Sequence, residues 1–468
     1  MYFEQIVRQD IGCAAYVVGS TDAGEAAVVD PRIDMVDEIL AIAAREGMKI
    51  RYIIETHNHA DHISGHARLS ELTGAAIAVH KDSGVEYPHL ALDDGQELTI
   101  GEVRLRIIHT PGHRPEHISV AAIDTTRGNE PWLVLTGDSL SIGDVARPDL
   151  AVDGKDGATA LFHSLHQKLL ELPAGTMVFP GHVAGSLCGR VNNRMTGTTI
   201  GFERTFNPAL TISDQTEFVR YMNESLPQRP PNMARIVKLN MLSEQPEVVT
   251  LHQLAVDNIA AQQADGALLL DVRSPADFGA AHIPGAINVH LDGGQFQNRV
   301  GLVFPPGARL VLITSSDLEA HRAVDALGVI GFTNIAGYVT GGMPRWELSG
   351  LDYESTSDIT VHELNERIDS DPTLQLLDVR EHTEWQDGHI ENAASVPFYK
   401  VREAAGSLDP RRPSALICAG GVRSMIAASI LQALGFTTVL NVEGGMDAWK
   451  AAQLPIVAEH AQAELAAS

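Results

Sequence analysis

The second half of the chain contains one segment twice, and this duplication restricts the possible folds more than any other feature. LLLDVRSPADFGAAHIPGAINV at 268–289 matches LQLLDVREHTEWQDGHIENAASV at 374–396, and GGMPRW at 341–346 matches GGMDAW at 444–449. A period of about 105 residues is too long for a solenoid and fits a duplicated domain. Each copy alternates helical patterns with short apolar strands, which predicts a parallel sheet with helices on both faces.

The preceding part of the chain differs, because its apolar strands run directly into turns that carry histidine and aspartate. Four segments follow this layout: KIRYIIETHNHADH (49–62), ELTIGEVRLRIIHTPGH (97–113), PWLVLTGDSL (131–140) and GTMVFPGHVAG (175–185). In α/β folds the loops at strand ends usually carry the chemistry. We therefore expect a functional site built from four strand ends.

A proline-rich polar stretch, LPQRPPN at 226–232, separates these two parts. Prolines fix the backbone and break helices, so the stretch is typical of a linker or a domain edge. With a second boundary between the two copies, the sequence predicts three domains, at 1–245, 246–352 and 353–468.

The composition disfavours several classes of function. Lys and Arg number 34 and Asp and Glu number 60, so the formal net charge is −26. Such a charge disfavours non-specific binding to nucleic acid or to an anionic membrane surface. No apolar run reaches the ~18 residues of a membrane-spanning helix, and the N-terminus lacks the pattern of a secretory signal. Three cysteines fit a reducing compartment, so we expect a cytoplasmic protein without membrane or nucleic-acid partners.

Seven side chains of metal-binding types are concentrated in the four strand-end turns. They are His57, His59, Asp61, His62, His113, Asp138 and His182. Imidazoles two residues apart on an extended backbone point to the same side, and the neighbouring glycines let the turns bend toward a shared point. This mixture of ligands suits zinc, iron or manganese and leaves open positions for substrate. The residues alone leave the choice of metal open.

This pattern resembles the metallo-β-lactamase superfamily, which implies an αββα sandwich over residues 1 to about 235, with the metal at one edge of the two sheets. The segments RPDL (147–150), FERTFNPAL (202–210) and RPPNMARIVKLN (229–240) are similar to the persulfide dioxygenase branch. That resemblance implies one Fe(II) per chain, held by His57, His113 and Asp138. A ligand set of two histidines and one carboxylate leaves three positions open on the iron, enough for O₂ and a sulfur ligand.

The other four residues then orient ligands and waters, or hold the second metal found in other members of the superfamily. These are His59, Asp61, His62 and His182.

A second candidate site follows the strand of ALICAGGVRSMIAASIL, at Cys418. Ala419, Gly420, Gly421 and Val422 form a turn of small residues, and Arg423 and Ser424 open a helix. Converging backbone N–H groups and about half a positive charge at the helix N-terminus favour the thiolate. We expect the loop to hold an anion or a persulfide sulfur on Cys418, with Arg423 binding an oxygen of sulfite or thiosulfate.

The C-x-x-x-x-R spacing and the flanking LDVR, HI and GGMDAW motifs resemble the rhodanese sulfurtransferases, which implies two doubly wound parallel-sheet domains. Related phosphatases have a loop one residue longer, so the loop length favours sulfur. In the first copy Thr314 stands opposite Cys418 and Glu319 opposite Arg423. We therefore expect no sulfurtransferase activity there, and a role in packing, dimerisation or shaping the path between sites. A different activity stays open.

Other candidate residues have weaker support. Cys188 follows His182 closely and could approach the metal pocket, where it would relay or sense persulfide, although a structural role is the more common one for cysteine. Arg147, Arg190 and Arg194 are candidates for binding a substrate, against the usual role of a solvated charge. Cys13 is expected to be a core residue.

The whole chain resembles a persulfide dioxygenase–rhodanese fusion. The resemblance implies that a low-molecular-weight thiol persulfide, such as glutathione persulfide, is oxidised with O₂ to sulfite, and that Cys418 transfers sulfane sulfur among thiosulfate, sulfite and thiols. We expect a homodimer or tetramer. Two alternatives remain: a zinc thioesterase of the glyoxalase II type fused to a sulfur carrier, and a non-enzymatic persulfide sensor or scaffold.

Overall fold

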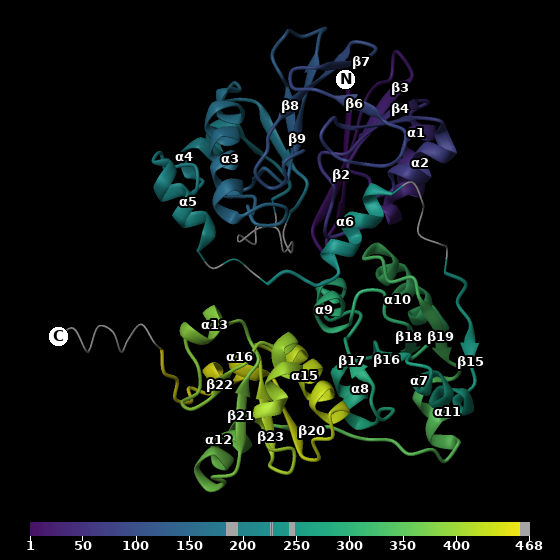
Figure 1. The fold of residues 1–468 in the computed structure, drawn as a ribbon, viewed down its shortest axis with the longest axis vertical. Helices are drawn as coiled ribbons and strands as arrows, with labels where there is room; N and C mark the ends of the chain where they lie inside the picture. Colours follow the sequence, from purple (N-terminus) through teal and green to yellow (C-terminus); the bar gives the residue numbers. More distant parts are fainter. Residues whose placement is uncertain (184–194, 225, 227, 243–248, 459–468) are drawn as a thin grey trace, which may run out of the picture. The chain divides into compact units, whose positions relative to one another are not determined.

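The computed structural model describes residues 1–183, 195–224, 226, 228–242 and 249–458 (Figure 1). The chain divides into two compact units, Met1–Glu247 with Gly328–Gly331, and Val248–Leu327 with Phe332–Ser468. Within the described ranges, no helix combines the length and the apolar character needed to cross a lipid bilayer.

The first unit contains two six-stranded sheets. The first sheet runs in spatial order through β1 (Tyr2–Arg8), β2 (Cys13–Ser20), β3 (Glu25–Val29), β4 (Lys49–Ile54), β5 (Ala76–His80) and β6 (Leu90–Leu92). The second runs through β14 (Thr198–Thr199), β13 (Met177–Pro180), β10 (Leu133–Gly137), β9 (Ile118–Asp124), β8 (Val103–His109) and β7 (Glu97–Ile100). A small ribbon pairs β11 (Leu140–Ser141) with β12 (Asp144–Val145).

Helices lie outside both sheets of this unit (Figure 1). They are η1 (Ile33–Met35), α1 (Val36–Arg45), α2 (His66–Thr73), α3 (Gly154–Gln167), η2 (Leu169–Glu171), α4 (Ile200–Phe206), α5 (Gln215–Asn223) and α6 (Met233–Met241). Helices α1 and α2 pack on the first sheet, while α3 and α5 cover the second.

The alternation of side chains along β9 shows how the layers form. Ile118, Val120 and Ala122 belong to the apolar cluster between the two sheets. Ala121 points to the other face, where it joins Leu161 of α3 in a second cluster. Because successive strand residues face opposite sides, one strand contributes to both cores. The predicted αββα sandwich is confirmed.

The second unit contains two five-stranded parallel sheets with the same strand arrangement. The first sheet has the order β15-β19-β18-β16-β17 and the second β20-β24-β23-β21-β22. The first repeat comprises β15 (Gln253–Leu254), η3 (Val256–Asn258), α7 (Ile259–Ala264), β16 (Leu268–Asp271), α8 (Pro275–Ala280), β17 (Ile287–Asn288), α9 (Phe296–Val303), β18 (Leu310–Ile313), α10 (Asp317–Val329), β19 (Ile335–Val339) and α11 (Gly342–Leu348).

The second repeat has matching elements. They are β20 (Ser357–Ile359), α12 (Val361–Ser370), β21 (Gln375–Asp378), α13 (His382–Gln386), β22 (Ala394–Ser395), η4 (Phe398–Lys400), α14 (Val401–Ala404), η5 (Ala405–Ser407), β23 (Ser414–Ile417), α15 (Val422–Ala433), β24 (Val439–Val442) and α16 (Gly445–Ala451). The duplication predicted from the sequence is therefore a duplication of one parallel α/β topology.

The repeated LDVR motif forms the same buried ion pair in both copies. Arg273 Nη2 lies 2.6 Å from Asp271 Oδ2 and donates to the carbonyl of Ala281. In the second copy Arg380 Nη2 lies 2.6 Å from Asp378 Oδ2 and donates to the carbonyl of Gly388. The pair ties the strand end to the end of the following helix, and this is the physical reason for the repeated residues.

Candidate functional site

Three of the predicted ligands meet at the edge of the sandwich in the first unit. His57 follows β4, His113 lies in the turn between β8 and β9, and Asp138 follows β10. Asp138 Oδ2 lies 3.3 Å from His113 Nε2 and 3.8 Å from His57 Nε2. All three residues are buried, and their ligand atoms lie within 4.8 Å of one another. The strand ends therefore converge on one point.

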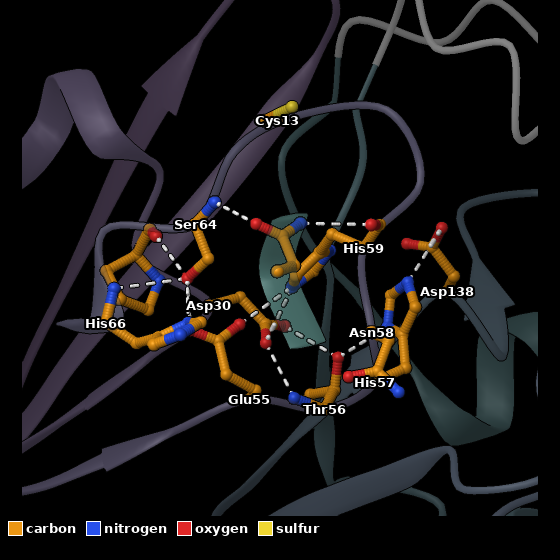
Figure 2. Close-up of polar contacts among 12 residues, drawn as sticks. Cys13, Asp30, Glu55, Thr56, His57, Asn58, His59, Ser64, His66 and Asp138 are labelled. Atoms are coloured by element: carbon orange, nitrogen blue, oxygen red, sulfur yellow. Dashed lines mark hydrogen bonds and ion pairs between the residues drawn. The ribbon is translucent and has the colours of Figure 1, made fainter. Parts of the chain in front are cut away.

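The hydrogen bonds of the two histidines fix which ring nitrogen faces that point. Thr56 Oγ1 donates its proton to Asp30 Oδ2, so it accepts from His57 Nδ1 at 2.9 Å (Figure 2). His113 Nδ1 lies 3.1 Å from the carbonyl oxygen of Arg147 and must donate to it. In both rings Nδ1 therefore carries the proton, and the Nε2 lone pair is free to bind a metal.

The position of Asp138 depends on the glycine before it. Gly137 has a φ of 49°, and a Cβ atom there would lie 2.6 Å from Thr56 Oγ1 and 2.7 Å from His117 Nε2. Only glycine fits this conformation and this space. The backbone N–H of Asp138 donates to His117 Nε2 at 3.0 Å, which holds the turn against the histidine cluster.

His182 connects Asp138 to the neighbouring pair Asp61 and His62. Its Nδ1 lies 2.6 Å from Asp138 Oδ1, and its Nε2 lies 2.7 Å from Asp61 Oδ2. His62 Nδ1 lies 3.2 Å from Asp61 Oδ1. The structure thus groups five of the other six predicted residues around Asp138. His182 contacts one of its carboxylate oxygens, and the other oxygen faces His57 and His113.

His59 lies beside His57, with ring centroids 4.2 Å apart, but its Nε2 faces a different pair of groups. That atom lies 3.2 Å from Asp30 Oδ1 and 3.1 Å from Glu55 Oε2 (Figure 2). Burial lowers the pKa of His59, but the two carboxylates raise it by more, so the net pKa lies well above its usual value. The contacts of His59 with Asp30 and Glu55 therefore hold the HNHADH turn in place.

The site fits a metal ion on the evidence of its unpartnered atoms. His57 Nε2, His59 Nδ1, His62 Nε2 and Asp138 Oδ2 are buried and have no hydrogen-bond partner within the described structure. Buried polar atoms are rarely left without a partner, and the usual exceptions include sites that take an ion.

The charge states of the ligands agree with this interpretation. Burial and the neighbouring histidines hold the pKa of His57 well below its usual value, and burial lowers the pKa of His113. Burial raises the pKa of Asp138, but His182 lowers it by more, so the net pKa falls. Neutral imidazoles and an ionised carboxylate are the forms that coordinate metals.

Three residues near this centre were not predicted as part of it. Cys13 is buried as expected, yet its Sγ lies 3.5 Å from Asp61 Oδ2, 3.6 Å from His62 Nδ1 and 3.7 Å from His182 Nε2. His117 supports Asp138, and burial lowers its pKa to about 3. Asn240 of α6 donates to the carbonyl oxygens of His59 and His62.

Only Asn240 lay in a segment that the sequence singled out, RPPNMARIVKLN. For Cys13 and His117 the only sequence signals were a cysteine at the start of a strand and a histidine four residues after His113. Neither signal identifies a residue of the metal site unless the fold is known.

Arg147, a predicted substrate-binding residue, forms an ion pair with a neighbouring carboxylate. Its guanidinium pairs with Asp149, with Nε 2.8 Å from Oδ1 and Nη2 3.0 Å from Oδ2. Its backbone carbonyl, rather than its side chain, orients His113. Cys188, Arg190 and Arg194 lie outside the described residues.

The predicted sulfur-transfer loop surrounds Cys418 in the second unit. Cys418 is 1% exposed, and its Sγ accepts from the backbone N–H of Gly421 at 3.0 Å. Ser424 Oγ lies 3.4 Å from the same sulfur. Ala419 and Gly420 complete the turn between β23 and α15, while Val422, predicted in the turn, is already the first residue of α15. The structure therefore brings the loop residues together as the sequence indicated.

The GGM motif at the start of α16 donates backbone hydrogen bonds to the carbonyls of this loop. Met446 N–H donates to the Cys418 carbonyl at 2.7 Å, and Asp447 N–H donates to the Ala419 carbonyl at 3.0 Å. Gly445 has a φ of 53°, and a Cβ atom there would lie 2.2 Å from the Cys418 carbonyl oxygen. The N-terminus of α16 therefore closes against the loop only because this residue is glycine.

Arg423, the other residue predicted at this site, makes a two-pronged ion pair with Glu384 of α13. Its Nη1 lies 2.6 Å from Glu384 Oε2 and its Nη2 lies 2.9 Å from Oε1. The guanidinium thus has one carboxylate partner at the rim of the loop.

Comparisons with known proteins identify the families of both units. Residues 8–182 match the metallo-beta-lactamase superfamily, and residues 254–349 and 360–452 each match the rhodanese-like domain. The mitochondrial persulfide dioxygenase ETHE1 of Homo sapiens is 30% identical over 236 residues, 50% of this chain and 85% of that protein. Its counterpart from Bos taurus is 30% identical over 227 residues, 48% of this chain and 82% of that protein.

A solved structure extends the likeness beyond the first unit. A metallo-beta-lactamase from Staphylococcus aureus subsp. aureus COL aligns with a TM-score of 0.64 and 27% identity, over 72% of this chain and 98% of that one. The similarity therefore includes residues beyond the metallo-beta-lactamase match.

Proposed function

The chain belongs to the metallo-beta-lactamase superfamily as a homologue of the persulfide dioxygenases and carries two rhodanese-like domains, and from this premise we propose a two-site enzyme of sulfur metabolism. The first site oxidises a low-molecular-weight thiol persulfide, such as glutathione persulfide, with O₂. The second transfers sulfane sulfur through Cys418. The observation that carries the proposal is the set of buried, unpartnered ligand atoms at His57 and Asp138, with His113 beside them.

The proposed cofactor of the first site is one Fe(II) held by His57, His113 and Asp138. When bound there, ferrous iron supplies the redox chemistry with O₂ that side chains cannot provide. The chain's own contribution is orientation. Thr56 and the Arg147 carbonyl hold two imidazoles with Nε2 facing inward, and His182 holds one oxygen of Asp138.

The proposed reaction balances with water as the third reactant. One persulfide RSSH, one O₂ and one H₂O give one thiol RSH and one sulfurous acid, which ionises to sulfite. The outer sulfur loses four electrons and O₂ gains four. The S–S bond breaks, and the RS group leaves as RSH with one of the three protons that RSSH and water supply.

At the second site the Cys418 thiolate attacks the outer sulfur of thiosulfate. A new S–S bond forms to Cys418, the old S–S bond breaks, and sulfite leaves with the electron pair. An acceptor thiolate then takes the terminal sulfur, which releases a new persulfide and restores the Cys418 thiolate. Splitting the transfer into two displacements is the usual advantage of a covalent nucleophile.

The test is an oxygen-electrode measurement on anaerobically purified, Fe(II)-loaded protein given glutathione persulfide, with sulfite and thiosulfate quantified. We expect His113→Ala to lose iron and O₂ uptake while keeping thiosulfate sulfur transfer. His163→Ala, on the exposed face of α3, is the matched control and keeps both. Two bound zinc ions and no O₂ uptake in the wild type would contradict the proposal.

A second candidate function is a zinc thioesterase of the glyoxalase II type. It is favoured by Asp61, His62 and His182, which stand beside Asp138 as a second metal site would require, and by the unpartnered Nε2 of His62. Hydrolysis of S-lactoylglutathione by protein containing two zinc ions, without O₂ consumption, would identify this function.

A further inference from the structure

The first rhodanese-like repeat lacks a cysteine at its loop, yet its elements contact α15 and η4 of the second repeat. Helix α15, which begins directly after the Cys418 loop, packs against β17 of the first repeat. The backbone N–H of Asn288 at the end of β17 donates to Ser429 Oγ of α15 at 3.1 Å. Helix α9, the next element after β17, packs against η4, which itself packs against α15. Helix α9 is therefore linked to α15 through η4.

Arg299 lies on α9 and has an unusual environment for an arginine. Its side chain is half-buried, and its Nη1 donates to the carbonyl of Gly293 at 2.9 Å. No carboxylate within the described ranges lies within 4.0 Å of its guanidinium. A guanidinium has five donors, and Arg299 uses one of them on a neutral acceptor.

The ionisable groups that interact electrostatically with Arg299 are Cys418 and Arg423 of the second repeat. Burial, and then the positive charge of Arg423, lower the pKa of Arg299 to about 10, while Cys418 acts in the opposite direction. Arg299 therefore stays protonated at neutral pH, within electrostatic range of both loop residues. A partly buried cation without a counter-ion is costly unless an anion is brought to it.

The contrast with Arg423 shows where an anion is needed. Arg423 is neutralised by the two-pronged contact with Glu384, so the pair adds little net charge to the loop. Arg299 has no such partner in the described structure. Arg299, the guanidinium without a carboxylate partner that interacts electrostatically with Cys418, thus belongs to the repeat whose own loop has no cysteine.

We propose that Arg299 of the first repeat binds the oxyanion end of anionic sulfur donors, such as the sulfonate oxygens of thiosulfate, while their outer sulfur meets Cys418. The proposal rests on the sulfur transfer proposed above and gives it a substrate class. It also gives the first repeat a function, as the source of a specificity residue for its neighbour. Arg299 is a positioning residue for the donor and takes no part in the bond exchange.

The first arm of the test is steady-state thiosulfate sulfurtransferase activity of the full chain with cyanide as acceptor. Arg299→Gln is expected to raise the KM for thiosulfate roughly tenfold or more with little change in kcat, because one charge-assisted contact is lost. Arg299→Lys is expected to recover part of that loss. Arg322→Gln is the matched control, since Arg322 lies on α10 of the same repeat and is paired with Asp292. An unchanged KM in Arg299→Gln would overturn the proposal.

The second arm measures anion binding at Cys418 without turnover. Alkylation of Cys418 by anionic iodoacetate and by neutral iodoacetamide is followed by mass spectrometry of the peptide that contains it. Arg299→Gln is expected to reduce the iodoacetate rate about tenfold relative to the iodoacetamide rate. An unchanged iodoacetamide rate shows that the loop is intact, and an unchanged ratio would overturn the role of Arg299. If the wild type transfers no sulfur but the ratio falls, the proposed function fails and the anion site stands.

Discussion

The two rhodanese-like repeats place different chemical groups at the same position of the same topology. In the second repeat Cys418 Sγ accepts the backbone N–H of Gly421, at the start of α15. In the first repeat Thr314 takes the cysteine's place, and the carboxylate of Glu319 accepts the backbone N–H of Ser315. In the second repeat a backbone N–H of the loop therefore points at the cysteine sulfur. In the first repeat the corresponding loop has a backbone N–H that donates to a carboxylate.

The surroundings of the two loops are nearly identical, which makes the difference informative. Both repeats keep the buried Asp–Arg pair, and both keep a glycine whose missing Cβ lets the following helix approach the loop carbonyls. The shared residues therefore maintain the fold, and the loop residues decide the chemistry. If Arg299 acts as proposed, the first repeat serves the second through their shared contacts.

The largest expected effect is the loss of sulfur transfer in Cys418→Ser. Because the thiolate forms the covalent bond in the proposed reaction, its removal should lower thiosulfate sulfurtransferase activity by about 10³-fold or more. Thiocyanate formation with cyanide as acceptor measures it. Thr314→Ser is the matched change in the other repeat and should leave the activity unchanged. Transfer at the wild-type rate in Cys418→Ser would show that the two loops do not differ in the way described.

The next largest effect is a loss of stability that should be the same in both repeats, because both contain the same buried Asp–Arg ion pair. Asp271 and Asp378 are fully buried against Arg273 and Arg380. Asp271→Asn or Asp378→Asn leaves a buried guanidinium without its counter-charge, at a cost of about 3–5 kcal/mol in the free energy of unfolding. Urea unfolding followed by tryptophan fluorescence measures this cost. A large loss in only one variant would contradict an equivalent role for the two pairs.

The sequence predicted most reliably the features whose residues lie close together in the chain. The repeated motifs, the strand-end turns and the Cys418 loop are local patterns, and the structure shows each of them. The αββα sandwich also followed from a resemblance carried by short motifs. Such patterns are readable because strand ends and helix starts place neighbouring residues at one edge of a sheet.

The contacts that could not be predicted join residues far apart in sequence. Cys13 of the first sheet contacts His182, which follows β13 of the second sheet. Arg423 pairs with Glu384 of a preceding helix, and α9 packs against η4. Periodicity and composition carry no information on such pairings, because they depend on how the finished layers pack. The sequence therefore predicts only a core position for Cys13, and the structure adds its contacts with the candidate ligands Asp61, His62 and His182.

A moderate, pH-dependent effect is expected from His282 in the first repeat. Its ring stacks on Phe278 with centroids 3.8 Å apart, and burial lowers its pKa to about 4. In the unfolded chain the ring takes up a proton below about pH 6.5, so acidification from 6.5 toward 4 favours unfolding. Below about pH 4 both states are protonated and the contribution stays constant. At neutral pH and above, the buried ring is neutral and its full contribution is present.

The measurement is the difference in melting temperature between the wild type and His282→Gln at pH 7.5 and at pH 5. The difference should shrink at pH 5, by an amount that corresponds to about 2 kcal/mol, because only the wild type loses this contribution. A difference that does not change with pH would show that the buried ring is not kept neutral by the fold.

The smallest effect, and the sharpest comparison of the two loops, comes from placing a cysteine in the first repeat. In a Cys418→Ser background, Thr314→Cys should gain no sulfur transfer, since the carboxylate of Glu319, in the first turn of α10, contacts the same loop and disfavours a nearby thiolate. Adding Glu319→Gln removes that charge and should speed alkylation at position 314 by iodoacetamide about tenfold at neutral pH, because more of the thiol ionises. Equal alkylation rates with and without Glu319→Gln would mean that the carboxylate does not distinguish the loops. Sulfur transfer by Thr314→Cys alone would mean that the cysteine is their only functional difference.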